Sequence, residues 1–261
     1  MFFKKKKSKV IFISNCGSIP HEPAPAVNFI PNWFQVQKSY TSEESKTHAW
    51  LKNTIKPSFS PSIKKCIPMR ESMTAGYIIP FPYDVAVKCT FDEQIGEPVI
   101  GIYAGVPKIG YLETIGKHEL TQLKEYPLIK SKDFDAIKVF KFGNPWIIKT
   151  SPGVSCVFQH PQYQGFDKWE ILSGVVDTDD YQNNILFPTL FRLNVGDEFI
   201  IKAGSPMIQV IPFERKSWTH EVKQFPSKEE SILIDHSRHK INSSVGGNRY
   251  LRWFWKRKDY K

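Results

Sequence analysis

The sequence predicts a mostly β protein with a minor helical part. Short runs in which apolar and polar residues alternate recur along the chain, as in YDVAVKCTF from Tyr83 to Phe91, and this period is typical of half-buried strands. Nineteen prolines and 15 glycines favour turns and short extended segments, because proline interrupts helices and central strands. With 41% hydrophobic and 14% aromatic residues in 261, the chain can bury a sizeable core.

Residues 1–60 are expected to form an N-terminal extension. The apolar run Val10–Ser14 predicts a first strand, and the four prolines of IPHEPAPAVNFIPNW, from Ile19 to Trp33, predict an extended connection after it. Between Ser42 and Asn53, SEESKTHAWLKN places a serine before two acids. A short helix with Ser42 as N-cap is predicted there.

Residues 61–225 are expected to form the main β domain. The sequence from Ile55 to Phe91 alternates β-branched pairs with proline, and the run from Ile95 to Leu112 separates similar pairs by glycine. Lys117–Pro127 breaks this pattern and predicts a turn of helix or a polar loop. From Ile137 onward, successive short strands with turns between them predict a barrel or a sandwich.

Residues 226–261 predict a C-terminal helix and a basic aromatic tail. Ser227 followed by Glu229 and Glu230 is a typical helix start. In the tail, RWFWKRK alternates rings with cations from Arg252 to Lys258. Those rings either stack on nucleic-acid bases or pack against the domain with the cations in water. We expect the three regions to form one compact unit.

The net charge of +10 and the pI near 9.3 make an acidic partner plausible, whether nucleic acid, a nucleotide or an anionic surface. The four cysteines are scattered without a CxxC pair, which predicts reduced thiols in a cytoplasmic protein. The apolar run VIFI is too short for a signal peptide or a membrane span. No metal site is predicted, because His236 and His239 lie beside Arg238 and Lys240 on an expected solvated face.

One motif carries the functional question. GVVDTDDY, from Gly174 to Tyr181, is an apolar strand that ends in an aspartate-rich turn. Such a turn commonly serves the fold alone, with its aspartates accepting backbone N–H groups. A carboxylate on such a turn can also act as a general base when it lies within one hydrogen bond of water.

GVVDTDDY and the following FIIKAGSPMIQVIPF resemble motifs of the dUTPase and dCTP deaminase superfamily, in the same order and at similar spacing. MTAGYIIPFPYDV and KTSPGVS stand where that superfamily has its first motif and its phosphate loop. The resemblance implies a dUTPase-like β-barrel or β-clip, usually a homotrimer with sites between subunits. It also implies a Mg²⁺-dependent pyrophosphatase site in which Asp177 positions the attacking water, Tyr181 lies beneath the deoxyribose and Gln209 stabilises a strand or subunit contact.

The chain departs from that pattern around the phosphate. An extra aspartate precedes Tyr181, and KTSPGVS lacks arginine, so that Lys149, Ser151 and Ser155 are the remaining candidates to contact a ligand. An enzyme would need Asp177 and Asp179 directed into one cleft together with a cation. The glycine-rich C-terminal arm of the superfamily is absent as well. These departures favour a retained fold with an altered or lost catalytic site.

A second resemblance covers most of the chain. IKKCIPMRESMTAGYIIPFPYDV, KFGNPWIIKTSPGVSCVFQHP, GVVDTDDYQNNILFP and AGSPMIQVIPFER are similar to a family found in marine phages and some bacteria, which has no assigned activity. The resemblance implies a phage protein in the host cytoplasm or in the virion.

Three functions follow as hypotheses. The first is a phage-type β-domain protein, enzymatically weak or inactive, that binds a nucleotide-like ligand or an assembly partner. The second is a nucleoside-triphosphate pyrophosphatase that uses Asp177 with Mg²⁺ and Lys149; no other cofactor is implied. The third is a structural component of the virion or of its assembly.

Overall fold

The computed structural model describes residues 8–14, 17–42, 59–104, 115–118, 120–165, 167–243 and 249–261. The chain forms two compact units. Unit 1 comprises Met1–Phe29 and Ala75–Arg215, and unit 2 comprises Ile30–Thr74 and Lys216–Lys261. Strands predominate over helices, as the sequence predicted. The boundaries expected after residues 60 and 225 stay a prediction.

Unit 1 holds most of the strands, and its described pairings are all antiparallel. The strands are β1 (Val10–Ser14), β2 (Ala24–Pro25), β5 (Tyr77–Pro80), β6 (Val85–Asp92), β7 (Glu97–Ala104), β8 (Ile115–Lys117), β9 (Ala136–Phe142), β10 (Trp146–Thr150), β11 (Val154–Gln159), β12 (Trp169–Ile171), β13 (Gly174–Val176), β14 (Phe187–Leu193), β15 (Glu198–Ile201) and β16 (Pro206–Glu214). Its short helices are η1 (Ala26–Phe29), α3 (Leu120–Leu123) and η4 (Pro127–Lys130). β1 and α3 confirm the predicted first strand and helical turn.

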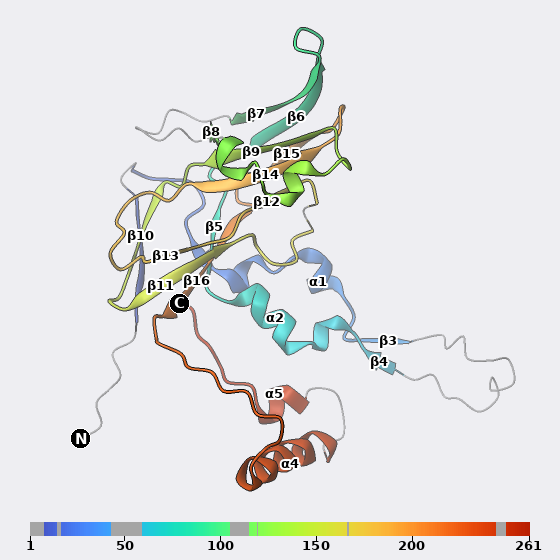
Figure 1. Ribbon diagram of the computed structural model, residues 1–261, viewed down its shortest axis with the longest axis vertical. Coiled ribbons are helices and arrows are strands. Elements are labelled where there is room, and N and C mark those ends of the chain that lie inside the picture. The colour runs from blue at the N-terminus through green and yellow to red at the C-terminus, as the bar shows by residue number, and fades with distance from the viewer. Residues whose placement is uncertain are drawn as a thin grey trace, which may run out of the picture. The chain divides into compact units, whose positions relative to one another are not determined.

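The strands of unit 1 form four sheets. Their orders are β13-β11-β16-β5-β2, β12-β14-β9-β8, β15-β6-β7 and β1-β10. Figure 1 shows the five-stranded and four-stranded sheets as separate layers. Because β11 and β16 lie next to each other along Val154–Gln159, the loop before β11 lies beside the residues that follow β16. That adjacency positions the candidate site.

The core of unit 1 collects the inward faces of all four sheets. In β6, Val85, Val87 and Cys89 are buried while Lys88 is exposed, which is the period-2 alternation predicted from the sequence. Phe81 makes edge contacts with the rings of Phe142 and Trp169, with centroids 5.5 and 5.6 Å apart. Aromatic pairs of this geometry add to the stability that burial supplies.

The described strands form no closed barrel. β9 pairs with β14 along Ala136–Phe142 but with β8 only over Phe140–Phe142, and β7 ends the three-stranded sheet. Closure would need the edge strands of these sheets to pair with one another, which the described residues do not do. The barrel alternative of the predicted fold is therefore not observed, and open sheets stand in its place.

Unit 2 is partly helical. Its elements are α1 (Asn32–Val36), β3 (Tyr40–Ser42), β4 (Phe59–Pro61), η3 (Ile63–Lys65), α2 (Ile67–Thr74), α4 (Lys228–Asn242) and α5 (Arg249–Trp253). The sequence predicted β structure from Ile55 to Phe91, and α2 corrects this over eight residues. Pro68 falls in the first turn of α2, where the missing N–H costs no hydrogen bond. Most of the helix predicted at Ser42–Asn53 lies outside the described residues.

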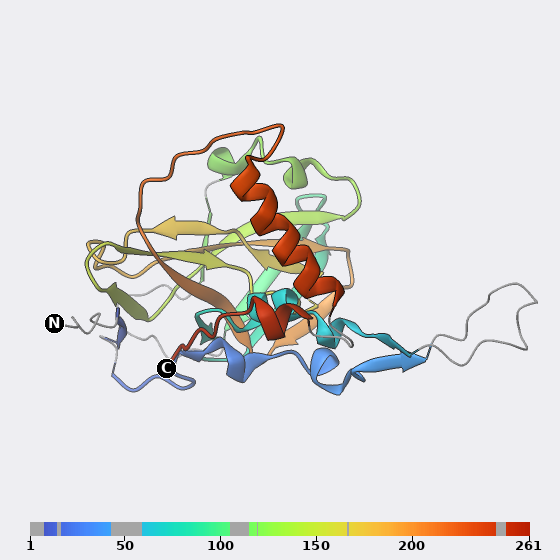
Figure 2. The same ribbon diagram turned by 90° about the horizontal axis from the view of Figure 1, so that it is seen from below.

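The C-terminal helix begins as predicted. Ser227 caps α4 by accepting the Glu230 N–H at 3.2 Å, and Glu230 accepts the Ser227 N–H at 2.8 Å, which completes a capping box. Figure 2 shows α4 as a straight helix (red). No helix in the described part of the chain is both long and apolar enough for a membrane crossing.

The basic tail is anchored within unit 2. The Trp255 Nε1–H donates to Glu71 Oε1, and Lys258 Nζ donates to Glu71 Oε2, both at 2.6 Å. Burial alone would raise the pKa of Glu71, but the hydrogen bonds from Lys258 and Trp255 hold it below its usual value. Of the two alternatives for the tail rings, packing is the one that Trp255 adopts.

Candidate functional site

The aspartate-rich turn follows β13 at the edge of the five-stranded sheet. The N–H groups of Asp180 and Tyr181 both donate to the Asp177 carbonyl, at 3.1 and 2.9 Å. These bonds close a single helical turn. The carboxylates of Asp177 and Asp179 then come within reach of one cation, Arg215.

Asp179 and Arg215 form a bidentate ion pair. Arg215 Nη1 donates to Asp179 Oδ1 at 2.7 Å, and Nη2 donates to Oδ2 at 2.6 Å. The Gly153 N–H also donates to Oδ2, at 2.8 Å, and the Asp179 side chain is only 12% exposed. The Arg215 hydrogen bonds, followed by the Gly153 bond, lower the pKa of Asp179 to about 2. Both oxygens of this carboxylate are therefore engaged by the protein itself.

Asp177 differs from Asp179 in its exposure, with 64% of its side chain open to solvent. Ser155 Oγ donates to Asp177 Oδ1 at 2.6 Å, and Arg215 Nη1 lies 3.2 Å from the same oxygen. Arg215 Nη1 also donates to Ser155 Oγ at 3.0 Å. The buried Ser155 hydroxyl thus fixes one Asp177 oxygen while much of the carboxylate remains accessible.

Buried hydroxyls anchor the turn from beneath. Thr178 is fully buried, and its Oγ1 lies 2.9 Å from Thr150 Oγ1. The Thr150 N–H donates to the Thr178 carbonyl at 3.2 Å, and the Thr178 hydroxyl donates to Cys156 Sγ at 3.3 Å. Because buried polar groups are costly to unpair, this network holds the turn in one conformation.

The other predicted ligand contacts are distributed around this cluster. Lys149 is exposed on β10, between the buried Ile148 and Thr150. Since neighbouring strand residues face opposite sides, Lys149 points away from the side on which Thr150 meets the turn. Ser151 Oγ accepts the Lys9 N–H at 2.9 Å, and the Tyr181 ring is 45% exposed. Of Lys149, Ser151 and Ser155, only Ser155 contacts a predicted acid in the described structure, and that acid is Asp177.

Gln209 has a structural environment within unit 1. It is fully buried, its Nε2 donates to the Ala75 carbonyl at 2.8 Å, and its Oε1 accepts from Gln159 Nε2 at 3.3 Å. Gly76 lies next to this contact, and a Cβ added there would stand 2.0 Å from the Val210 carbonyl oxygen. Gln209 thus joins β16 to the residues before β5.

Arg215 is the functional residue that the sequence analysis missed. The sequence predicted the ligand-side cation within KTSPGVS, whereas the cation that contacts the acids stands at the end of IPFER. The Arg215 N–H donates to the Gly153 carbonyl at 2.8 Å, directly after the Val154–Glu214 pair of β11 and β16. Knowledge that β11 pairs with β16 would have placed Arg215 beside the loop that contains Gly153.

No similar protein adds evidence about the site. Comparisons with protein-family models, curated proteins and solved structures gave no match. Within the described ranges, no three His, Cys, Asp or Glu side chains are grouped so as to hold a metal ion.

Proposed function

We propose that this chain is a phage-type β-domain protein with a dUTPase-like β-clip core, and that it binds a partner through β13 and the Asp177–Tyr181 turn without strong catalysis. The Asp179–Arg215 ion pair is the observation that carries the proposal. It links the turn to β16 and leaves the turn accessible mainly through Asp177.

The ion pair argues against strong catalysis. A general base or a metal ligand must direct a free lone pair at water, and its pKa should lie near the working pH. Both Asp179 oxygens accept hydrogen bonds from Arg215, and the pKa of about 2 makes this carboxylate a weak base. Arg215, in turn, is held by the acids and is poorly placed to stabilise charge that develops on a phosphate.

The charge of the turn favours a protein partner over a phosphate. Among the described residues, Asp177 and Asp179 both pair with the Arg215 guanidinium, and Asp180 adds a third carboxylate to the turn. The turn itself therefore carries more negative than positive charge, which favours cations or hydrogen-bond donors over anions. β13 adds a sheet edge that pairs with no further strand in the described part of the chain, and Val175 on this edge is 62% exposed. Exposed edges of this kind accept an added strand from a partner.

A second copy of the chain fits this chemistry. The net charge of +10 gives each copy basic surface to complement the acidic turn of another, and closed symmetric assemblies are common among soluble oligomers. In this proposal the β13 edge and the turn form one side of a self-assembly contact, as a homotrimer would use.

Sedimentation of the purified chain tests this proposal. We expect a concentration-dependent oligomer that weakens as salt rises, because the contact includes charges. Val175→Lys, which puts a charge on the β13 edge, and Asp177→Asn should both shift the chain toward the monomer. Val195→Lys, an exposed valine outside β13, is the matched control. A chain that stays monomeric at every concentration would overturn the self-assembly contact.

A nucleotide pyrophosphatase is the second candidate. The exposed Asp177 carboxylate and the exposed Tyr181 ring favour it, because they are the residues that the superfamily resemblance assigns to the attacking water and the sugar. In this reaction Mg²⁺ would have to offset the negative charge of the turn before a triphosphate could approach.

A further inference from the structure

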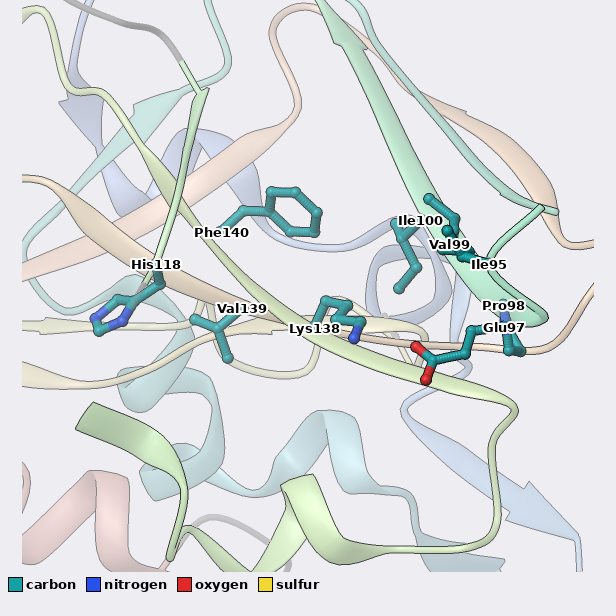
Figure 3. Close-up of a pocket in the computed structure, with 9 residues that line it drawn as sticks. All are labelled: Ile95, Glu97, Pro98, Val99, Ile100, His118, Lys138, Val139 and Phe140. Carbon is teal, nitrogen blue, oxygen red and sulfur yellow. The ribbon is translucent and has the colours of Figure 1, made fainter. Parts of the chain in front are cut away.

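A pocket of about 190 Å³ lies in unit 1, away from the aspartate turn (Figure 3). Its walls come from the start of β7 with Ile95 in the turn that precedes it, from β9, and from the residue after β8. The lining residues are Ile95, Glu97, Pro98, Val99, Ile100, His118, Lys138, Val139 and Phe140. None of them belongs to the site proposed above.

The pocket exists because two sheets diverge at this point. β7 pairs with β6 along its whole length, from Glu97 to Ala104, but has no ladder with β9. β8 covers β9 only at Phe140–Phe142. Side chains of β7 and β9 therefore line a space that backbone pairing does not close, and two rigid strands preform it.

The lining combines an apolar body with two opposite charges. The apolar members outnumber the polar ones, and Ile100 and Val139 are buried. Figure 3 shows the Lys138 ammonium and the Glu97 carboxylate on the same side of the pocket, with His118 at the other end. Among the described residues, neither Lys138 nor Glu97 has an ion-pair partner. Lys138 is half-buried, and an ammonium that is partly removed from water without a partner is costly.

We propose that this pocket binds a small zwitterion with an apolar body, of the chemical class of a free apolar amino acid. The ligand carboxylate would meet Lys138 and its ammonium would meet Glu97. The apolar body would lie against Ile100, Val99 and Phe140. A cavity of roughly 150 Å³ lined by apolar side chains holds benzene, so a leucine or phenylalanine side chain suits the space.

The two charges make this class more specific than a general apolar ligand. A ligand with only a carboxylate would leave Glu97 unpaired beside a second anion. A ligand with only an amine would leave Lys138 unpaired beside a second cation. Charged hydrogen bonds formed at a partly desolvated rim are stronger than those in open water. Binding should therefore need both groups on one molecule.

Titration of the full chain with three matched compounds tests the inference, using calorimetry and saturation-transfer NMR. L-leucine carries both charges, 4-methylpentanoate lacks the ammonium, and 3-methylbutylamine lacks the carboxylate. We expect leucine to bind roughly tenfold more tightly than either of the others. Absence of leucine binding at millimolar concentration, or equal affinity for all three compounds, would overturn the proposal.

Charge-removing variants assign the contacts. Lys138→Gln should abolish the advantage of leucine over the amine, and Glu97→Gln should abolish its advantage over the carboxylate. Lys141→Gln is the control for Lys138→Gln, because it removes a positive charge from the opposite face of β9. Glu93→Gln is the control for Glu97→Gln, because it removes a negative charge from the hairpin turn before β7. Both controls should leave the affinities unchanged. If Lys138→Gln binds leucine as the unaltered chain does, the assigned orientation is wrong and the proposal fails.

Discussion

Arg215 and Asp179 meet through two parallel hydrogen bonds, of 2.7 and 2.6 Å, which join the residue after β16 to the turn after β13. The two residues are 36 positions apart in the sequence. Because an arginine fork matches a carboxylate in geometry as well as in charge, the pair fixes the direction of the turn and not only its position.

Substitution of Arg215 should loosen the turn. Arg215→Gln removes both hydrogen bonds from the guanidinium to Asp179 and leaves that carboxylate with backbone N–H donors, chiefly that of Gly153. We expect a lower unfolding midpoint and faster amide exchange at Gly153. The exposed Arg238, whose pair with Asp235 is on the surface of α4, supplies the control Arg238→Gln, which should change neither quantity measurably. Equal effects of the two substitutions would contradict the proposed role of Arg215.

The stability contributed by Asp179 should depend on pH in the acidic range. Its folded-state pKa of about 2 lies below the value near 3.9 that is usual for an unfolded chain. The contribution is therefore complete above about pH 4 and is lost as the pH falls towards 2. Urea unfolding of the unaltered chain and of Asp179→Asn should show a stability difference at pH 6 that shrinks between pH 4 and pH 2. A difference that stays constant across this range would contradict the assignment.

Gly76 should tolerate no side chain. Its φ is +72°, and an added Cβ would stand 2.0 Å from the Val210 carbonyl oxygen. Gly96 has a similar φ of +69° with nothing within 4 Å of the added Cβ. Gly96→Ala should thus cost only the strain of the left-handed backbone, about 1–2 kcal/mol, while Gly76→Ala should cost considerably more. Chemical denaturation of both variants measures the difference, and equal costs would show that the backbone around Val210 yields easily.

Removal of Glu71 should free the tail of unit 2. Glu71→Ala removes the acceptor of Trp255 Nε1–H and of Lys258, so the tail loses two hydrogen bonds to α2. We expect trypsin to cleave the tail faster, because trypsin cleaves after lysine and arginine and the tail contains Lys256, Arg257 and Lys258. Glu221→Ala, at an exposed position outside this contact, is the control. An unchanged cleavage rate in Glu71→Ala would show that other contacts hold the tail.

Local signals in the sequence predicted local structure well. The apolar run at Val10–Ser14 predicted β1, and Ser227 with the two acids after it predicted the start of α4. Both predictions succeeded because a short strand and a helix cap depend on residues that are neighbours in the sequence. α2 was missed because the prolines and isoleucines around it form a sequence pattern that is typical of short strands. A proline such as Pro68 is compatible with a helix when it lies in the first turn, which is its position in α2.

The candidate site could be predicted only in part. The turn residues Asp177 and Asp179 were recognised from one continuous motif, and the structure brings both carboxylates to Arg215, with Ser155 contacting Asp177. Arg215 was not recognised, because its approach to the turn depends on the pairing of β11 with β16. The direction of Lys149 depends likewise on the register of β10 against β1. Strand pairing and register are non-local properties that one sequence does not display.

The engaged carboxylate of Asp179 should leave the turn without strong catalytic activity. The most direct measurement is pyrophosphate release by the purified chain from a panel of nucleoside and deoxynucleoside triphosphates with Mg²⁺, beside Asp177→Asn. We expect no release above the background of Asp177→Asn with any nucleotide. Release from one triphosphate that Asp177→Asn abolishes would contradict it and establish the pyrophosphatase instead.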